Sequence, residues 1–138
     1  EDMGLSIGTP GFLPGLSGLK NLQLLASHRK KIGCKEITKA MRHAGLDPKL
    51  KRRAGKYPAE MRQRLGIAQA VMEDPSLLIL DEPFGSLDKQ GATDMQKLIR
   101  ELGDSGKTIL LTGQSAEEFG GICDTVCGLD DGRLAVIL

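Results

Sequence analysis

The sequence predicts an α/β fold, in which a helical lobe at about residues 17–73 precedes a small, mostly parallel sheet. Two observations carry this prediction. Apolar residues recur at helical spacing in the first half of the chain, whereas the second half contains short, continuous apolar runs typical of buried strands. A helical pattern lies between successive runs, and this alternation favours parallel pairing, because parallel strands need a crossover connection.

The composition fits one domain with a real core. The 138 residues are 40% hydrophobic but only 3% aromatic, so the core must consist of aliphatic side chains and Met. Three cysteines without a CxxC pair favour neither a disulfide framework nor a zinc site, and they fit a reduced, cytosolic setting. No apolar run approaches the ~20 residues that span a bilayer, and the N-terminus does not read as a signal peptide. We therefore expect any link to a membrane to go through a partner.

The net charge of +1 conceals two oppositely charged halves. Residues 1–60 carry 12 Lys and Arg against 5 Asp and Glu, whereas residues 61–138 carry 7 against 13. Eleven of the basic residues lie between Arg29 and Lys56. A basic surface can bind nucleic acid, an anionic membrane or an acidic protein. No stacking aromatics are interleaved with these charges, so a solvated helix face is favoured and no nucleic acid is expected.

The first half is predicted to hold three helices. Residues 3–18 are rich in Gly and Pro, which predicts a loop with fixed bends. Ser17 is a suitable N-cap for the first helix, a second helix ends at Gly45, and a basic connector leads to a third with Pro58 near its first turn. Their apolar positions are Leu19, Leu22 and Leu25, then Ile37, Ala40, Met41 and Ala44, and then Met61, Leu65, Ala68 and Met72.

The second half is predicted to hold four strands and two helices. Strands are expected near residues 77–81, 108–112, 124–129 and 133–138, the first two buried on both faces and the first three parallel. Asp130-Asp131-Gly132 predicts an antiparallel hairpin for the last two. A helix that begins at Asp88 is expected to end at Gly103, and Ser115 begins a capping box for a short helix. The longer helix should bury Met95, Leu98, Ile99 and Leu102.

Asp81 and Glu82 follow the apolar run Leu77–Leu80 directly, so they are expected at the carboxyl end of a core strand. Ligands of open α/β sheets bind at that edge. One carboxylate there can hold a hydrated Mg²⁺ while its neighbour polarises a water for attack on a phosphate. A plain acidic turn after a core strand is the alternative interpretation.

The run from Leu65 to Asp88, LGIAQAVMEDPSLLILDEPFGSLD, resembles the nucleotide-binding domains of ABC transporters, in which a helix, a Walker B strand and a D-loop follow one another. The resemblance implies that Asp81 supports Mg²⁺, that Glu82 is the catalytic base, and that Asp88 communicates across a dimer. It also implies an ATP-hydrolysing subunit, with ATP and Mg²⁺ as cofactors and a second nucleotide-binding domain as partner. Such a subunit is cytoplasmic and lies at the inner face of the membrane through a permease.

The resemblance divides the chain into a Q-loop-like segment (1–16), a helical signature subdomain (17–73) and a Walker B, D-loop and switch part (74–138). Pro58, Ala59 and Glu60, followed by Met61, stand at the signature positions, where the family has Ser and Gly that donate to the γ-phosphate held by the opposite subunit. Pro58 has no N–H, and Glu60 brings negative charge toward a triphosphate.

Two further positions depart from the family pattern. Gly8 replaces the Gln or Glu of the Q-loop. Gln114 replaces the switch histidine as the second expected catalytic residue; it can donate a hydrogen bond to a phosphate oxygen but cannot carry the positive charge of His or shuttle a proton.

The phosphate-loop pattern G-x-x-x-x-G-K-[ST] occurs nowhere in the chain. We therefore expect a fragment that is inactive as an ATPase on its own. Two alternatives remain: a catalytically degenerate regulatory or docking module of the same fold and, more weakly, a soluble ATPase relative associated with nucleic acid. In the family the phosphate-loop strand lies between the strand matching 108–112 and the terminal strands. Without it, either the hairpin of residues 124–138 fills the gap or copies of the chain self-associate.

Overall fold

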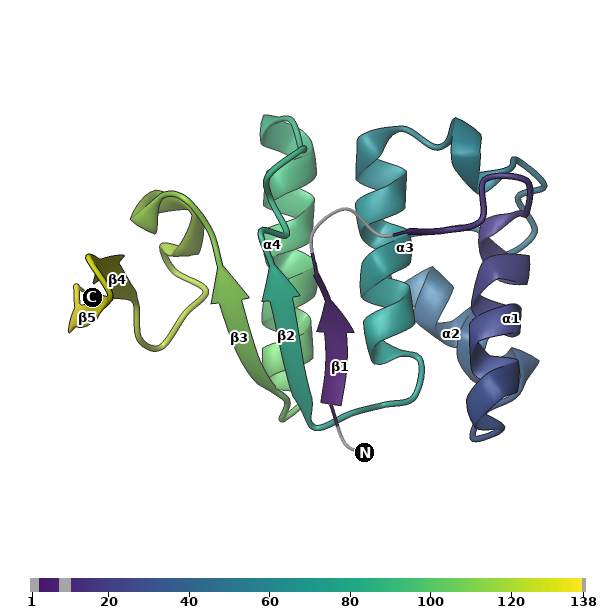
Figure 1. The fold of residues 1–138 in the computed structure, drawn as a ribbon, viewed down its shortest axis with the longest axis horizontal. Coiled ribbons are helices and arrows are strands. Elements are labelled where there is room, and N and C mark those ends of the chain that lie inside the picture. The colour runs from purple at the N-terminus through teal and green to yellow at the C-terminus, as the bar shows by residue number, and fades with distance from the viewer. Residues whose placement is uncertain (1–2, 8–10, 138) are drawn as a thin grey trace.

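The structure, a computed structural model, describes residues 3–7 and 11–137 and confirms the α/β class (Figure 1). The Q-loop position Gly8 lies outside the described residues. In chain order the elements are β1 (Met3–Ser6), α1 (Gly18–Arg29), α2 (Cys34–His43), the 3₁₀ turn η1 (Ala54–Lys56), α3 (Ala59–Val71), β2 (Leu77–Asp81), α4 (Lys89–Asp104), β3 (Thr108–Thr112), the 3₁₀ turn η2 (Ala116–Phe119), β4 (Cys127–Asp130) and β5 (Arg133–Val136).

A parallel sheet of order β1-β2-β3 forms the centre of the molecule. The prediction of a loop throughout residues 3–18 is wrong for its first residues, because Met3–Ser6 form strand β1. Gly4 explains the error. A Cβ at this position would lie 2.1 Å from the carbonyl oxygen of Ala70 in α3 and 2.8 Å from Leu78 Cδ2. The glycine therefore allows a strand to approach a helix closely and does not mark a turn.

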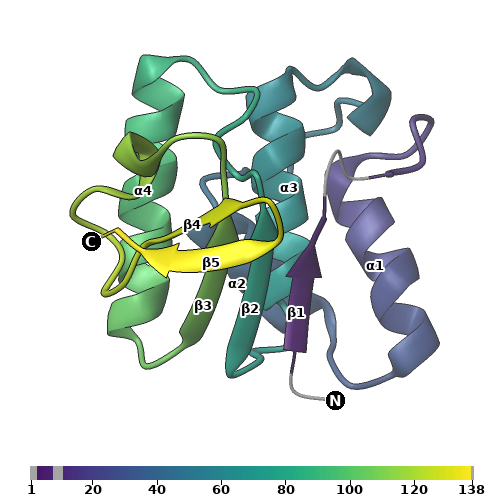
Figure 2. The same cartoon turned by 60° about the vertical axis from the view of Figure 1, so that its left-hand side comes forward.

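Helices α3 and α4 lie on the same side of this sheet (Figures 1 and 2). Leu78 and Leu80 point to that side and are fully buried, among apolar side chains of the helices. On the opposite side, the register aligns Leu5 with Ile79 and Leu110, of which Leu5 is 42% and Leu110 56% exposed. The strands at 77–81 and 108–112 are thus not buried on both faces as predicted, because no helix covers this second face in the described part of the chain.

The predicted terminal hairpin is confirmed. Strands β4 and β5 pair antiparallel, and Asp131 and Gly132 form the two-residue turn with φ of 49° and 75°. This positive-φ pair is the geometry that matches strand twist in tight hairpins.

The predicted parallel pairing of residues 124–129 is wrong, because the hairpin forms its own two-stranded sheet beyond β3 (Figure 1). Contacts to α4 account for this position: Gln96 Nε2 donates to the carbonyl of Glu118 at 3.0 Å, and the Arg100 guanidinium donates to the carbonyl of Gly121. They attach the segment that leads from β3 to β4 to helix α4. Within residues 3–7 and 11–137, β3 pairs with β2 alone, so the hairpin does not fill the expected gap.

The helices begin and end close to the predicted positions. Ser17 caps α1, its hydroxyl accepting from the N–H of Lys20 at 3.3 Å, and Gly45 follows α2 with a φ of 81°. The end of α4 differs, because the helix continues through Gly103 to Asp104. The left-handed residue that follows its C-terminus is Gly106, with a φ of 95°. None of the helices in the described residues has the length and apolar character needed to cross a bilayer.

Candidate functional site

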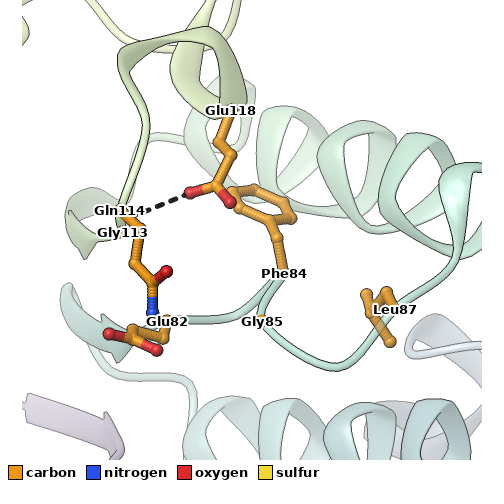
Figure 3. A pocket seen from close by; sticks show the side chains of 7 residues that line it. All are labelled: Glu82, Phe84, Gly85, Leu87, Gly113, Gln114 and Glu118. Carbon is orange, nitrogen blue, oxygen red and sulfur yellow. Dashed lines mark hydrogen bonds between the residues drawn. The ribbon is translucent and has the colours of Figure 1, made fainter.

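A cavity of about 250 Å³ lies at the carboxyl edge of β2 and β3 (Figure 3). It brings together Glu82 and Gln114, the two residues predicted to be catalytic, from segments that are 32 positions apart. In Figure 3 the side chain of Gln114 extends from the end of β3 toward Glu82. The full lining is Glu82, Phe84, Gly85, Leu87, Gly113, Gln114 and Glu118.

The acidic pair is held by the neighbouring strand. Asp81 is the last residue of β2 and pairs in register with Thr112, whose hydroxyl donates to the Asp81 carboxylate. Glu82 follows with a φ of 48°, and its N–H donates to the Thr112 hydroxyl at 3.1 Å and to the Thr112 carbonyl at 3.2 Å. Asp81 and Glu82 are thus both hydrogen-bonded to the last residue of β3, and a turn begins at Glu82, whose carbonyl accepts from the N–H of Gly85 at 3.1 Å.

The donor set of this edge fits Mg²⁺. Carboxylate oxygens are hard ligands, and Mg²⁺ is usually held by one or two carboxylates together with waters and substrate phosphates. Among the described residues no group of three or more His, Cys, Asp and Glu could hold a metal. A closed, all-protein site, such as those for structural zinc, does not exist there. Asp81 and Glu82 instead match the open type of site that phosphates complete.

The segment after β3 is fixed by Glu118. Its carboxylate accepts from the backbone N–H of Gln114 at 3.2 Å, while the Ser115 hydroxyl accepts from the N–H of Glu117 at 3.2 Å. The predicted capping box is therefore shifted, because the Glu118 carboxylate binds the residue before the cap and not the cap itself. A Cβ on Gly113 would lie 2.4 Å from Glu118 Oε2 and 2.5 Å from the Phe119 ring, so a larger residue there would displace these side chains.

Three of the four signature residues line a second, more open cavity of about 540 Å³ at the beginning of α3. Pro58 precedes the helix as its N-cap residue, and its side chain makes no capping hydrogen bond. Ala59 is not part of the lining. The remaining lining is shared by the α2–η1 loop and α4, and the whole set is Gly45, Leu46, Asp47, Pro58, Glu60, Met61, Arg64 and Asp94.

The charge of Glu60 is paired inside the chain. Arg64 donates to Glu60 Oε1 from Nε at 3.1 Å and from Nη2 at 2.9 Å, and its Nη1 donates to the carbonyl of Ala44 at 3.1 Å. Arg64 is also 3.9 Å from Asp94. The spacing of Glu60 and Arg64 is that of neighbours on one helix face, a signal that the sequence contains. Glu60 therefore brings less net negative charge to the beginning of α3 than its identity alone suggests.

Asp88 lines neither cavity. It is the N-cap of α4, and its Oδ1 accepts from the N–H of Gly91 at 2.7 Å. A Cβ on Gly91 would lie 3.2 Å from Glu60 Oε2, so the first turn of α4 runs close to the beginning of α3. Of the predicted site residues, Glu82 and Gln114 thus line the first cavity, and Pro58, Glu60 and Met61 line the second. Asp81, Ala59 and Asp88 line neither of the two.

Sequence reasoning missed two residues that contact the acidic pair, Thr112 and Gln63. Gln63 lies on α3, is 7% exposed, and donates from Nε2 to the carbonyl of Glu82 at 3.2 Å. A polar residue at a buried helical position is the signal that could have found Gln63, because buried amides require partners. Thr112 has no comparable signal, since threonine is common in strands.

Comparison with known proteins gives a family and a set of relatives. A family model described as "ABC transporter" matches residues 6–85, more than half of the chain. The bacitracin transport ATP-binding protein BcrA of Enterococcus faecalis is 36% identical over 96% of this chain and 43% of its own length. The fluoroquinolones export ATP-binding protein MT2762 of Mycobacterium tuberculosis is 31% identical over 99% of this chain and 45% of its own length.

A solved structure has the same fold. The dimeric post-hydrolysis state of an ATP-binding cassette bound to ADP and Pi superposes with a TM-score of 0.83 at 18% identity, over 99% of this chain and 63% of that one. The chain spans about half the length of the curated relatives that it matches. The family match, the relatives and the shared fold agree, and the chain belongs to the family of ABC transporter ATP-binding domains.

Proposed function

We propose that the chain supplies the Walker B, D-loop, signature and switch parts of the ATP-hydrolysing subunit of an ABC transporter. The observation that carries the proposal is the cavity that brings Glu82 and Gln114 together at the carboxyl edge of a parallel sheet, beside Asp81. Residues 17–73 would form its helical part and residues 74–138 its part of the ATPase core.

Each residue at this edge has a proposed role. Asp81 would hold Mg²⁺, which supplies charge neutralisation on the phosphate oxygens when bound. Glu82 would accept the proton of the attacking water, and the Gln114 amide would donate a hydrogen bond to a phosphate oxygen. Asp81 is kept in place by the Thr112 hydroxyl, which supports a defined position for the metal ligand.

The beginning of α3 would contact a nucleotide held by a second nucleotide-binding subunit. The first N–H groups of a helix have no partner within it, so Ala59, Glu60 and Met61 can offer backbone donors to a phosphate despite Pro58. The ion pair with Arg64 reduces the repulsion from Glu60. Asp88, at the beginning of α4, would communicate across the same dimer.

The names of the relatives support a transporter, and we propose a membrane permease as the other partner. The subunit would then be cytoplasmic, at the inner face of the membrane. Association of the chain with a permease during purification from a membrane fraction would support this partner.

Because its sequence contains no phosphate loop, the chain alone is proposed not to hydrolyse ATP. Isothermal titration with Mg·ATP should detect no micromolar binding, and phosphate release should remain at the buffer rate. Micromolar binding by the 138-residue chain would contradict this proposal.

A chimera tests the catalytic roles directly. Joining the phosphate-loop half of the Enterococcus relative to this chain should give ATP hydrolysis, and Glu82→Gln should lower its kcat by a factor of about 10² or more. Glu101→Gln is the matched control, because Glu101 is an exposed carboxylate on α4 that contacts His43 at 3.6 Å. Equal loss in both variants would reject Glu82 as the base.

A regulatory or docking module of the same fold is the second candidate. Pro58 and the Arg64-paired Glu60 at the beginning of α3 favour it, because neither supplies the hydroxyl and flexible glycine backbone of the family pattern. In the chimera, Pro58→Ser combined with Glu60→Gly should then create hydrolysis that the unmodified chimera lacks. An unmodified chimera that is already active would reject this candidate.

A further inference from the structure

Glu82 has an unusual backbone conformation for the residue proposed to be the base. Its φ of 48° lies in the left-handed region, which costs free energy for a residue with a Cβ. This conformation sets the direction in which the Glu82 side chain points. With an extended backbone, the side chain would continue the alternation of strand β2 between the two faces of the sheet. The carboxylate instead reaches the cavity that Gln114 lines (Figure 3).

Both polar groups of the Glu82 backbone have partners from other elements. On one side, the N–H donates to the hydroxyl and the carbonyl of Thr112 at the end of β3. On the other side, the carbonyl accepts from Gln63 Nε2 of α3 at 3.2 Å and from the N–H of Gly85 at 3.1 Å. Gln63 and Thr112 therefore hold one residue between the helix of the signature segment and the strand of the switch segment.

The Thr112 hydroxyl has two functions at this point. It accepts from the N–H of Glu82 and donates to the carboxylate of Asp81, so its single oxygen bridges the two acidic residues. Valine has the same shape but neither hydrogen bond, whereas serine keeps both.

We infer that Gln63 and Thr112 are positioning residues, which clamp Glu82 in its left-handed conformation and so direct the carboxylate of the acidic pair into the cavity. The clamp makes the direction of the Glu82 carboxylate depend on the positions of α3 and β3. Its catalytic consequence rests on the proposed function, but the conformational claim does not.

A double-mutant cycle measured by denaturant unfolding of the chain, without nucleotide, tests the clamp. Glu82→Gly removes the steric cost of the left-handed conformation, so it should raise the folding equilibrium constant more when both clamp side chains are present than when one of them is removed. The factor by which Glu82→Gly raises the folding equilibrium constant should be at least about threefold larger in the unmodified chain than in the Thr112→Val variant. The same difference is expected between the unmodified chain and the Gln63→Met variant. The greater freedom of glycine in the unfolded chain is equal on both sides of the cycle and cancels.

Two matched controls separate a clamp from ordinary stabilisation. Gln96→Met removes the same kind of helix-to-carbonyl hydrogen bond, but to Glu118, so its effect should be additive with Glu82→Gly. Thr112→Ser should retain the full coupling because it keeps the hydroxyl.

A spectroscopic measurement makes the test independent of stability. The three-bond HN–Hα coupling of Glu82 reports its φ, and it should move toward the value of extended backbone in Thr112→Val and stay unchanged in Thr112→Ser. If Thr112→Val does not fold, Gln63→Met provides the same comparison. Additive cycles together with an unchanged coupling constant would overturn the inference. Because no step requires ATP, an inactive chimera would reject the proposed function and leave the clamp intact.

In an active chimera, the same variants provide a kinetic readout. Thr112→Val should lower kcat and leave KM near its original value, and Thr112→Ser should restore kcat. A change in KM alone would show that Thr112 acts on nucleotide binding and not through Glu82.

Discussion

Replacing Gly4 by alanine tests strand β1, the element that the sequence pattern missed. The added Cβ would lie 2.1 Å from the Ala70 carbonyl oxygen, although real Cβ contacts are almost never shorter than 3.0 Å. Strand and helix must therefore separate by about 1 Å, and the atom in the way belongs to the backbone of α3 and cannot rotate aside. Overpacking typically costs about 1–3 kcal/mol. We expect about 3 kcal/mol here, because β1 must separate from α3 or lose its pairing with β2.

For a domain of this size, a loss of about 3 kcal/mol corresponds to a fall in Tm of about 10 °C. Thermal and urea unfolding followed by circular dichroism measure it. Gly11→Ala is the control, because a Cβ there meets no atom within 4 Å and should change the free energy of unfolding by no more than about 0.5 kcal/mol. Equal stability of the two variants would show that β1 does not pack against α3 as described.

Three further outcomes are expected. Burial, and secondarily the charge of Asp124, raise the pKa of the Cys123 thiol, so iodoacetamide near neutral pH should label Cys123 more slowly than the exposed Cys34, as mass spectrometry would show. The pKa of the Glu36 carboxyl is lowered by hydrogen bonds from the N–H groups of Glu36 and Gly33. The stability that ionised Glu36 contributes is therefore complete well above the ordinary pKa of 4.5 and is lost as the pH falls through the lower pKa of the folded state. Denaturant unfolding across this pH range should show the loss in the unmodified chain and not in Glu36→Gln. The free edge of β3 and the exposed Leu110 beside it should make the chain self-associate, and light scattering across a concentration series should show less association for Leu110→Lys. A monomeric wild-type chain at high concentration would contradict the last expectation.

The elements with a strong internal pattern could be predicted from the sequence. The four apolar residues before Asp81 form β2, and the residues expected inside α4, including Met95 and Leu102, are all buried. These patterns are local, because the period of the side chains follows from the geometry of one helix or strand. The signal for the β4–β5 hairpin is equally local, because the sequence of its turn fixes the register of the two strands.

The missed features depend on residues far apart in the sequence. Gly4 is read as a bend when it stands beside other glycines, and only the position of Ala70 shows that its role is close packing. The one-sided burial of β2 depends on which other elements reach the sheet. The cavity could be anticipated because both Glu82 and Gln114 follow strands, whereas the bond from Gln63 to Glu82 depends on how α3 crosses the sheet.

The isolated position of the β4–β5 hairpin has a consequence for the order in which the molecule opens. Leu129, Leu134 and Val136 are each 72% exposed, so little burial opposes separation of the two strands. A two-stranded hairpin alone is marginally stable in water. We expect its amides to exchange with deuterium through local opening, long before those of β2, whose strand is paired on both sides. Limited proteolysis should likewise cut first in the segment that joins η2 to β4, leaving the parallel sheet and its helices as the protected unit.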